Sequence, residues 1–357
     1  MKILFCSDAL IIDGVTSYIL NVGKVLKDAG HEVAIIGRWG GVKGFQSRYK
    51  EAGIKLITCP SIGVGNFYFD ICAKKFKPDI IMTDPRRSFP LATRLKKLTG
   101  AKVVTYFLDL VEKTDKPGRD IESLKKYSEV WTAFEDPILN KLHEIAPKFK
   151  IFELTRPVDA FIKFESLSEN ENFNILCFGR LSRGKTPGIF YMLDHIEEII
   201  NKIPNVKINI VGGSGWRLFK IKMLAHKINS RLGHEYIKIF GTQVNPIKFL
   251  REANLIFCVA SSAMESAYMG RPVIMIGSHY KGLLTPENLD DAIKSFFGER
   301  SGVLFEYKNL LPEIFKVYEN YRDEKFRDDL KNISVEINKK FSAGVMLRQF
   351  NKIIGSL

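Results

Sequence analysis

Cysteine is scarce in this chain of 357 residues, and its placement argues against two kinds of site. The five cysteines are odd in number, and no two of them have CxxC spacing. Neither a disulfide framework nor a zinc site is expected from that pattern. Cys6, Cys177 and Cys258 stand in apolar strand-like runs, where a thiol packs as a small hydrophobic group. This usage is typical of the reducing cytoplasm, and no metal is expected.

Long apolar runs are also lacking. No uncharged apolar stretch reaches the ~20 residues that a membrane-spanning helix needs. The apolar start of the chain, residues 3–6, is too short for a signal peptide. We therefore expect a cytoplasmic protein whose membrane contact, if it has any, is peripheral and lies at the inner face.

Acidic residues are outnumbered, with 40 Asp and Glu against 54 Lys and Arg, and the net charge is +14. A positive field favours anionic partners such as nucleotides or an anionic lipid surface, although solubility alone would also explain it. The chain lacks an RNA-binding signature and zinc-finger spacing, which argues against nucleic acid as a partner.

Short apolar runs alternate with helix-like runs along most of the chain, which predicts an α/β protein with parallel sheets and crossover helices on both faces. A polar stretch at 163–172 interrupts the alternation and is interpreted as a linker. We predict two tandem Rossmann-like, doubly wound sheets facing a cleft, with domains at 1–160 and 172–340 and a C-terminal helix, 343–357, that packs back onto the first. The expected strands are 3–6, 32–36, 54–58, 80–83, 103–107, 130–133, 151–154, 173–178, 207–211, 237–240, 255–259 and 273–276.

The most informative segment is FGRLSRGKTP at 178–187. It follows a strand-like run and opens a helix-like run, 188–201. The first N–H groups of a helix lack partners and, together with the peptide dipoles, favour anions. Arg180 and Lys185 add two cations that suit a diphosphate. The segment points to a nucleotide-activated substrate; a solvated loop with two unremarkable cations is the alternative.

Other strand–helix junctions carry weaker signals. Gly14 follows the first strand, where a glycine lets backbone approach a phosphate or sugar. Gly213 stands in a glycine cluster without GxGxxG spacing, so a dinucleotide fingerprint is unsupported. An ordinary tight turn is the alternative explanation for each of these glycines. His31 begins a strand at the end far from the ligand edge and is expected to be structural.

The segment ASSAMESAYMGRPV at 260–273 is the second strong signal. It predicts a serine-rich turn and a short helix with Glu265 in its first turn. A carboxylate there can accept two hydrogen bonds from a ribose diol, while the N–H groups of Ser262 and Ala263 face phosphate. Glu265 could alternatively complement the helix dipole.

Together these motifs resemble the GT-B glycosyltransferases, specifically the retaining family 4 group, over nearly the whole chain. GHEV at 30–33 looks like the family N-terminus, and RPVD at 156–159 with Phe161 is similar to its hinge motif. Residues 179–185 look like the donor-diphosphate clamp. Glu265 with GRPV at 270–273 resembles the second half of the family's Glu-x7-Glu motif.

The resemblance implies a donor site in the second domain that needs no metal, because cationic side chains replace it. Arg180 and Lys185 would stabilise the leaving diphosphate, and Glu265 would hold the ribose. Backbone N–H groups of Gly14, Ser262 and Ala263 would face phosphate. The remaining expected donor-site residues are Gly213 and, against the base, Gly241, Thr242 and Gln243.

Two departures concern the transferred sugar, which the family's first glutamate and a histidine normally touch. Phe257 stands where that glutamate is expected, and Leu108-Asp109 stands where the family often has His-Asp. Asp109 is the remaining candidate for a catalytic contact with sugar or acceptor.

We therefore expect a retaining glycosyltransferase of glycan or polysaccharide assembly. It would move a sugar from a nucleotide-diphosphate donor, with uridine as the expected base, to a glycan, lipid-linked or small-molecule acceptor. The alternatives are a non-catalytic GT-B homologue that serves as a binding or scaffolding subunit, a nucleotide-sugar epimerase of the same fold, and a surface-binding enzyme on lipid-linked glycans.

Overall fold

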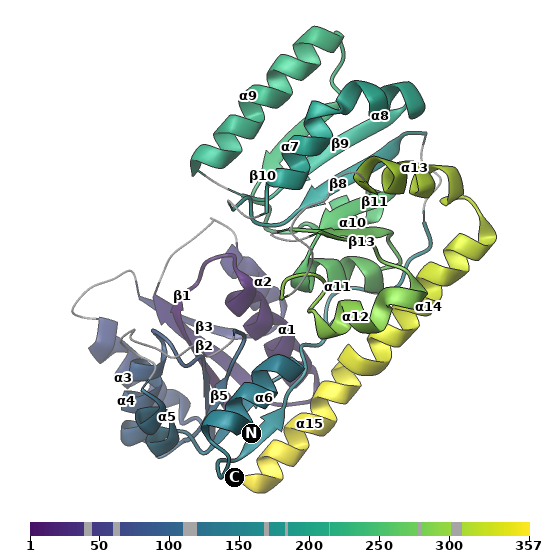
Figure 1. Ribbon diagram of the computed structural model, residues 1–357. Helices are drawn as coiled ribbons and strands as arrows, with labels where there is room; N and C mark the ends of the chain where they lie inside the picture. The colour runs from purple at the N-terminus through teal and green to yellow at the C-terminus, as the bar shows by residue number, and fades with distance from the viewer. Residues whose placement is uncertain are drawn as a thin grey trace. The chain divides into compact units, whose positions relative to one another are not determined.

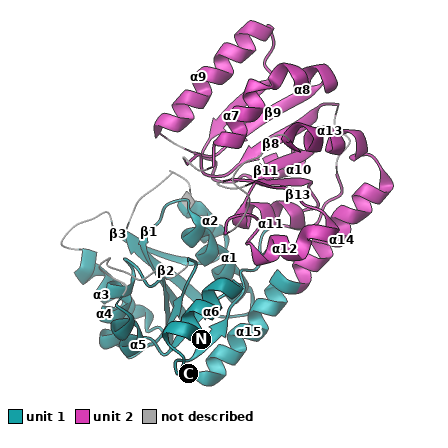
Figure 2. Ribbon diagram, in the orientation of Figure 1, with its two compact units in different colours: residues 1–161, 340–357 teal, residues 162–339 magenta. Residues whose placement is uncertain are grey.

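The protein is described here from a computed structural model, which covers residues 1–38, 45–59, 65–109, 120–167, 171–182, 185–213, 215–277, 280–300 and 309–357. The chain forms two compact units (Figure 2). The first contains Met1–Phe161 and Lys340–Leu357, and the second contains Ile162–Lys339.

The first unit is built on a seven-stranded sheet in the order β3-β2-β1-β4-β5-β6-β7, with every neighbouring pair parallel (Figure 1). Alternate side chains of a strand point to opposite faces. In β1, Ile3 and Phe5 therefore enter one core, and Leu4 and Cys6 enter another. The strands are β1 (Lys2–Ala9), β2 (Glu32–Arg38), β3 (Lys55–Cys59), β4 (Ile80–Thr83), β5 (Lys102–Tyr106), β6 (Val130–Ala133) and β7 (Ile151–Glu153).

Helices cover both faces of this sheet, as doubly wound connections require. The helix Phe45–Glu51 was not predicted; Tyr49 gives it a buried face, but seven residues are too few to show a helical period clearly. The helices are α1 (Gly14–Asp28), α2 (Phe45–Glu51), α3 (Gly65–Phe76), α4 (Phe89–Thr99), α5 (Ile121–Tyr127), α6 (Asp136–Ile145) and the distant α15 (Ala343–Ser356).

The RPVD segment fastens α15 to the first unit. The N–H of Val158 donates to the carbonyl of Phe341 at 2.8 Å, and Asp159 accepts from the N–H of Ala343 at 2.7 Å, at the start of α15. On the helix, Phe350 is buried in the core of the first sheet and its ring lies 5.8 Å from that of His31. His31 therefore has an aromatic packing partner, consistent with a structural role.

The second unit has a six-stranded sheet in the order β10-β9-β8-β11-β12-β13. The edge strand β13 runs antiparallel to β12, so this sheet departs from the all-parallel expectation at one strand. The strands are β8 (Phe173–Phe178), β9 (Val206–Val211), β10 (Ile237–Gly241), β11 (Leu255–Cys258), β12 (Val273–Ile276) and β13 (Tyr280–Leu283).

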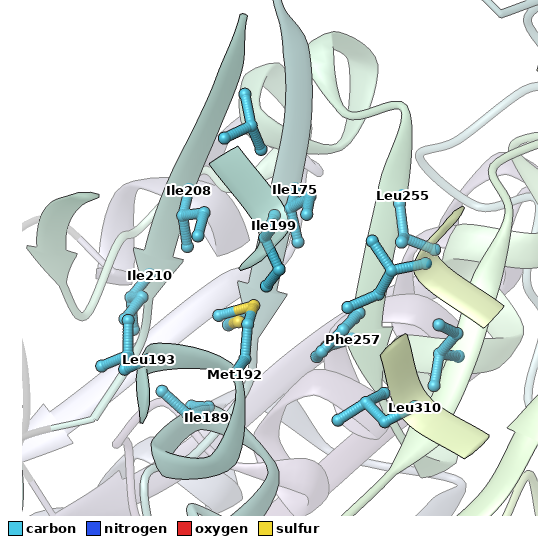
Figure 3. Packing of buried hydrophobic residues seen from close by; sticks show 14 of the residues in the cluster. Ile175, Ile189, Met192, Leu193, Ile199, Ile208, Ile210, Leu255, Phe257 and Leu310 are labelled. Atoms are coloured by element: carbon cyan, nitrogen blue, oxygen red, sulfur yellow. The ribbon is translucent and has the colours of Figure 1, made fainter. Parts of the chain in front are cut away.

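Isoleucine, leucine and phenylalanine side chains from strands and helices form the core of this unit (Figure 3). Two helix predictions need correction: the helix expected at 188–201 is broken at His195, and the helix carrying Glu265 begins at Ala260, so Glu265 lies in its second turn. The helices are α7 (Pro187–Asp194), α8 (Ile196–Lys202), α9 (Gly215–Leu232), α10 (Ile247–Glu252), α11 (Ala260–Tyr268), the short 3-10 helix η1 (Pro286–Asn288), α12 (Leu289–Lys294), α13 (Leu310–Asn320) and α14 (Glu324–Phe341).

Residues 163–167 contain neither helix nor strand, but they pack on the C-terminal end of α11. The N–H of Glu165 donates to the carbonyl of Met269 at 3.1 Å, and buried Arg271 donates to the carbonyl of Ser166 at 3.2 Å. The first half of the predicted linker is thus held against the second unit.

Candidate functional site

The strand order of the second sheet reverses at β8, since the chain continues outward through β9 and β10 on one side and through β11 and β12 on the other. Open α/β sheets bind ligands beyond the carboxyl ends of their strands at such a switch point. The segment with Arg180 and Lys185 follows β8, and α11 with Glu265 follows the neighbouring β11. The two strongest sequence signals therefore flank one switch point.

Lys185 is half-buried and forms an ion pair that the sequence did not predict. Its Nζ lies 2.7 Å from Oε2 of Glu299, and the two side chains are 18% and 29% exposed. Glu299 follows a tight turn in which Phe296, Phe297 and Gly298 all have left-handed φ values, of 48°, 50° and 83°. Such backbone costs energy in non-glycine residues and is found where surrounding structure enforces it.

The turn that carries Glu299 is also joined to the start of α11. The carbonyl of Phe297 accepts from the N–H of Ala260 at 3.3 Å, and Ala260 itself has a left-handed φ of 57°. Ala263 donates back to Val259 at 3.4 Å as part of the helix. The N–H of Ala263 already has an acceptor in the helix, whereas Ser262 precedes the first residue of α11 whose N–H does. Of the two predicted phosphate donors, Ser262 is therefore the better placed.

Glu265 and Lys185 act electrostatically on one buried thiol at the end of β11. Burial raises the pKa of the Cys258 thiol to about 12; the Ser266 hydroxyl lowers it, Glu265 raises it and Lys185 lowers it. The two predicted ligand groups, from different loops, therefore both lie near the carboxyl end of β11.

Arg180 is exposed and follows Gly179, which has a φ of 139°. A second arginine lies at the start of α7: Nη1 of Arg217 donates to Oγ1 of Thr186, the N-cap residue, at 3.3 Å. Arg217 was not among the residues that the sequence predicted for the site. Its position two residues after the glycine cluster was the available signal.

The loops after β8, β9 and β10 pack against one another. The N–H of Gly212 donates to the carbonyl of Gly241 at 2.6 Å, and Oγ1 of Thr242 donates to the carbonyl of Gly213 at 2.9 Å. The Gln243 side chain donates to the carbonyl of Phe240 at 2.8 Å. The predicted contacts to the base, Gly241, Thr242 and Gln243, thus line the same sheet edge as Gly213. Arg183, Gly184 and Ser214, which belong to these motifs, lie outside the described residues.

Gly14 and Asp109 belong to the first unit. Gly14 begins α1 behind Asp13, which forms a capping box with Thr16, and its carbonyl accepts from buried Arg156 at 3.4 Å. Asp109 is half exposed and forms an ion pair with Arg86. That contact gives Asp109 a structural partner that the sequence did not indicate.

Asp109 and Arg86 line a small hollow at the carboxyl ends of β4 and β5, together with Asp84. Asp84 accepts from the Ser88 hydroxyl at 2.6 Å and from the N–H of Arg86 at 2.8 Å. Burial raises the pKa of this carboxyl above its usual value, against the lowering effect of those hydrogen bonds. Sequence reasoning missed Asp84 and Arg86, although both follow a buried strand.

Phe257 is 3% exposed in the core of the second unit, so the position expected for the family's first glutamate points into the sheet packing (Figure 3). A carboxylate there would be buried without water, which is costly. Within the described ranges, no group of three or more His, Cys, Asp or Glu side chains is arranged to hold a metal ion.

No protein-family model matches the sequence, and no curated protein matches it. Solved structures match along the whole chain. HepE from Anabaena, solved with UDP, is 15% identical, aligns over 100% of both chains and has a TM-score of 0.67. A glycosyltransferase from Rickettsia africae is 17% identical over 99% of this chain and 97% of its own, with a TM-score of 0.64.

The chain has the GT-B fold. Its structural neighbours also include a putative UDP-N-acetylglucosamine 2-epimerase from Listeria monocytogenes, which is 14% identical over 97% of this chain and 94% of its own, with a TM-score of 0.63. At these identities the likeness establishes the fold. Because a glycosyltransferase and a putative epimerase share this fold, the fold alone does not decide which reaction the site supports.

Proposed function

We propose that the protein is a retaining glycosyltransferase of the family 4 type that uses a nucleotide-diphosphate sugar. The observation that carries the proposal is that Lys185 and Glu265 follow the neighbouring strands β8 and β11 at the switch point of the second sheet, with Arg217 at the start of α7. Cations beside a helix N-terminus suit a diphosphate, and a carboxylate nearby suits a ribose diol. Neighbours solved with UDP and with UDP-glucose support a uridine donor.

In the proposed reaction, the bond between the anomeric carbon and the diphosphate oxygen breaks as the acceptor oxygen bonds to the same face of that carbon. The acceptor proton passes to the leaving phosphate, so no separate base is needed. Arg180, Lys185 and Arg217 stabilise the charge that develops on the diphosphate, which is the kind of assistance that usually dominates catalysis. No metal is required in this scheme, since these cations take its place.

The finer parts of the proposal concern the acceptor and the location. Asp109 and the hollow around it are proposed to contact the sugar or the acceptor. The acceptor is proposed to be a glycan or a lipid-linked molecule of polysaccharide assembly, reached from the cytoplasmic side through peripheral contact with an anionic membrane. The surplus of basic residues over the chain, +14 in net charge, favours such a surface.

A non-catalytic role in a glycan-assembly complex is the second candidate, and one contact favours it. The ammonium of Lys185 already forms an ion pair with Glu299. A bound diphosphate would therefore share this ammonium with the Glu299 carboxylate or displace the carboxylate. The Lys185–Glu299 ion pair, together with Phe257 in place of a sugar-contacting glutamate, is the arrangement expected of a site that no longer binds a sugar nucleotide.

A thermal-shift panel of UDP-, GDP- and ADP-sugars separates the two candidates, because a ligand that binds the native state raises its apparent stability. We expect one nucleotide to raise the melting temperature of the wild type and Lys185→Ala to abolish that shift. Turnover with the stabilising donor should then fall in both Arg180→Ala and Lys185→Ala. A wild type that no sugar nucleotide stabilises, or variants with unchanged turnover, would contradict the transferase proposal.

A further inference from the structure

α9 has two apolar sides. One packs on the second sheet, with Ile221, Ala225 and Ile228 buried, and α9 lies beside β10 (Figure 1). At about 100° per residue, the opposite side of the helix should carry polar groups if it met only water. It carries three exposed large apolar side chains instead: Trp216 (67% exposed), Phe219 (50%) and Met223 (55%).

These three side chains form a continuous line, called the α9 stripe below. Their spacing, i, i+3 and i+7, places them above one another on the helix surface. The rings of Trp216 and Phe219 stack with centroids 5.2 Å apart, and the ammonium of Lys220 lies 5.7 Å from the Trp216 ring. Single exposed apolar residues need no explanation, but an ordered group of them marks an interaction surface.

Positive charge lines both sides of the stripe. Residues 215–232 contain five Lys and Arg residues and no Asp or Glu. By helical position, Lys220 and Lys227 lie on one side of the stripe and Lys222 on the other. The two arginines are directed elsewhere, since Arg217 contacts Thr186 and Arg231 pairs with Glu197 at 2.9 Å. The three lysines therefore remain as the charge of the stripe.

We propose that the α9 stripe docks on an anionic lipid bilayer. Tryptophan and other apolar groups enter the headgroup boundary, while flanking lysines contact anionic headgroups, which is the pattern of helices that lie in a membrane interface. An acid-free helix with lysines on both flanks matches a surface of uniform negative charge better than it matches a second copy of this basic chain. Among the described helices, none has the length and apolar character of a membrane span.

The α9 stripe lies close to the edge of the second sheet that carries the candidate donor site. Trp216 directly follows Gly215, at the end of the loop that leaves β9 at the ligand edge of the second sheet. A bilayer bound there lies next to the edge that carries the candidate donor site, where a lipid-linked acceptor is presented. The inference refines the proposed peripheral membrane contact, but it does not depend on sugar transfer, because vesicle binding needs neither nucleotide nor turnover.

The test is sedimentation of the full chain with vesicles of phosphatidylcholine alone or with phosphatidylglycerol, at low and high salt. The wild type should bind the anionic vesicles and be released by salt. Lys220→Gln, Lys222→Gln and Lys227→Gln should each weaken binding roughly fivefold. The triple variant Trp216→Ser, Phe219→Ser, Met223→Ser should weaken it about tenfold or more, also at low salt.

The first unit supplies a matched control, because α3 exposes three large apolar side chains of its own. Phe67→Ser, Tyr68→Ser and Ile71→Ser together should leave vesicle binding unchanged; these positions are 68%, 43% and 49% exposed. Circular dichroism should show that both triple variants keep the wild-type fold. The inference is overturned by a wild type that ignores anionic vesicles, by an α9 triple variant that binds as the wild type does, by an equal loss in the α3 variant, or by an α9 variant that changes only the oligomeric state.

Discussion

Replacing Gly212 by alanine should disrupt the junction on which the candidate donor site is built. The residue has a φ of 117°, and an added Cβ would lie 2.0 Å from the carbonyl oxygen of Gly179. That oxygen belongs to the backbone, so it cannot turn aside as a flexible side chain would. The N–H of Gly212 also donates to the carbonyl of Gly241 at 2.6 Å. Any movement that relieves the clash therefore distorts this hydrogen bond to the segment 241–243, which is expected to contact the base.

The magnitude follows from two terms. A non-glycine residue in this backbone region costs about 1 to 3 kcal/mol, and overpacking adds about 1 to 3 kcal/mol. The unfolding free energy should therefore fall by about 2 to 6 kcal/mol, a large part of the ~5 to 15 kcal/mol typical of a domain. The substitution should also abolish binding of the stabilising nucleotide. Gly179, Gly212 and Gly241 lie at the ends of β8, β9 and β10, and Gly212 contacts both of the others, so a shift of one displaces all three loops.

Urea unfolding followed by circular dichroism measures the first effect, and calorimetric titration of the nucleotide measures the second. Gly14→Ala is the matched control for the stability measurement alone, since Gly14 has no atom within 4 Å of an added Cβ and needs no left-handed φ. Its stability should stay within about 0.5 kcal/mol of the wild type, as for surface substitutions in general. A Gly212→Ala protein that loses less than about 1 kcal/mol would refute the reasoning about the close approach.

Two further predictions concern single carboxylates. Glu265→Ala should weaken nucleotide binding by about 1.5 to 3 kcal/mol, roughly a ten- to hundredfold rise in Kd by calorimetry, while unchanged affinity would remove Glu265 from the site. For Asp84, burial raises the folded-state pKa above its usual value of 3.8, so the native state binds this proton more tightly than the unfolded chain. The associated stabilisation is complete below 3.8 and is lost as pH rises through the folded pKa. Relative to Asp84→Asn, the wild type should therefore lose melting temperature with rising pH over that interval; a constant difference across pH 3 to 8 would contradict the assignment.

The alternation of strands and helices was predictable because parallel strands buried on both faces are continuous apolar runs. Leu255–Cys258 and Val273–Ile276 are examples, and the two sheets follow from such runs. β13 was not found because Tyr280–Leu283 contains a glycine and a lysine, and its place at an edge comes from pairing with β12, which local pattern does not encode.

In the candidate site, the glycine-rich junctions and their cations were visible because they are local in the sequence. The partner of Lys185 was not, since Glu299 is 114 residues away and reaches it only through a left-handed turn at two phenylalanines. Phenylalanine rarely adopts a left-handed φ, so its presence in the sequence does not predict such a turn. The start of α11 was misplaced for a related reason, because the left-handed Ala260 does not look like the first residue of a helix.

The fastening of α15 has a consequence for synthesis. Met346, Phe350 and Ile353 complete a core whose other members come from the first strands and helices of the chain. A ribosome makes the entire second unit before it makes these three residues. The first unit therefore emerges with an open apolar face, waits while another unit of similar size is translated and folds, and closes only when its late helix arrives. Nascent chains should therefore need a chaperone to cover the apolar face of the first unit. A chain terminated before α15 should fold its second unit and aggregate through the exposed core of the first.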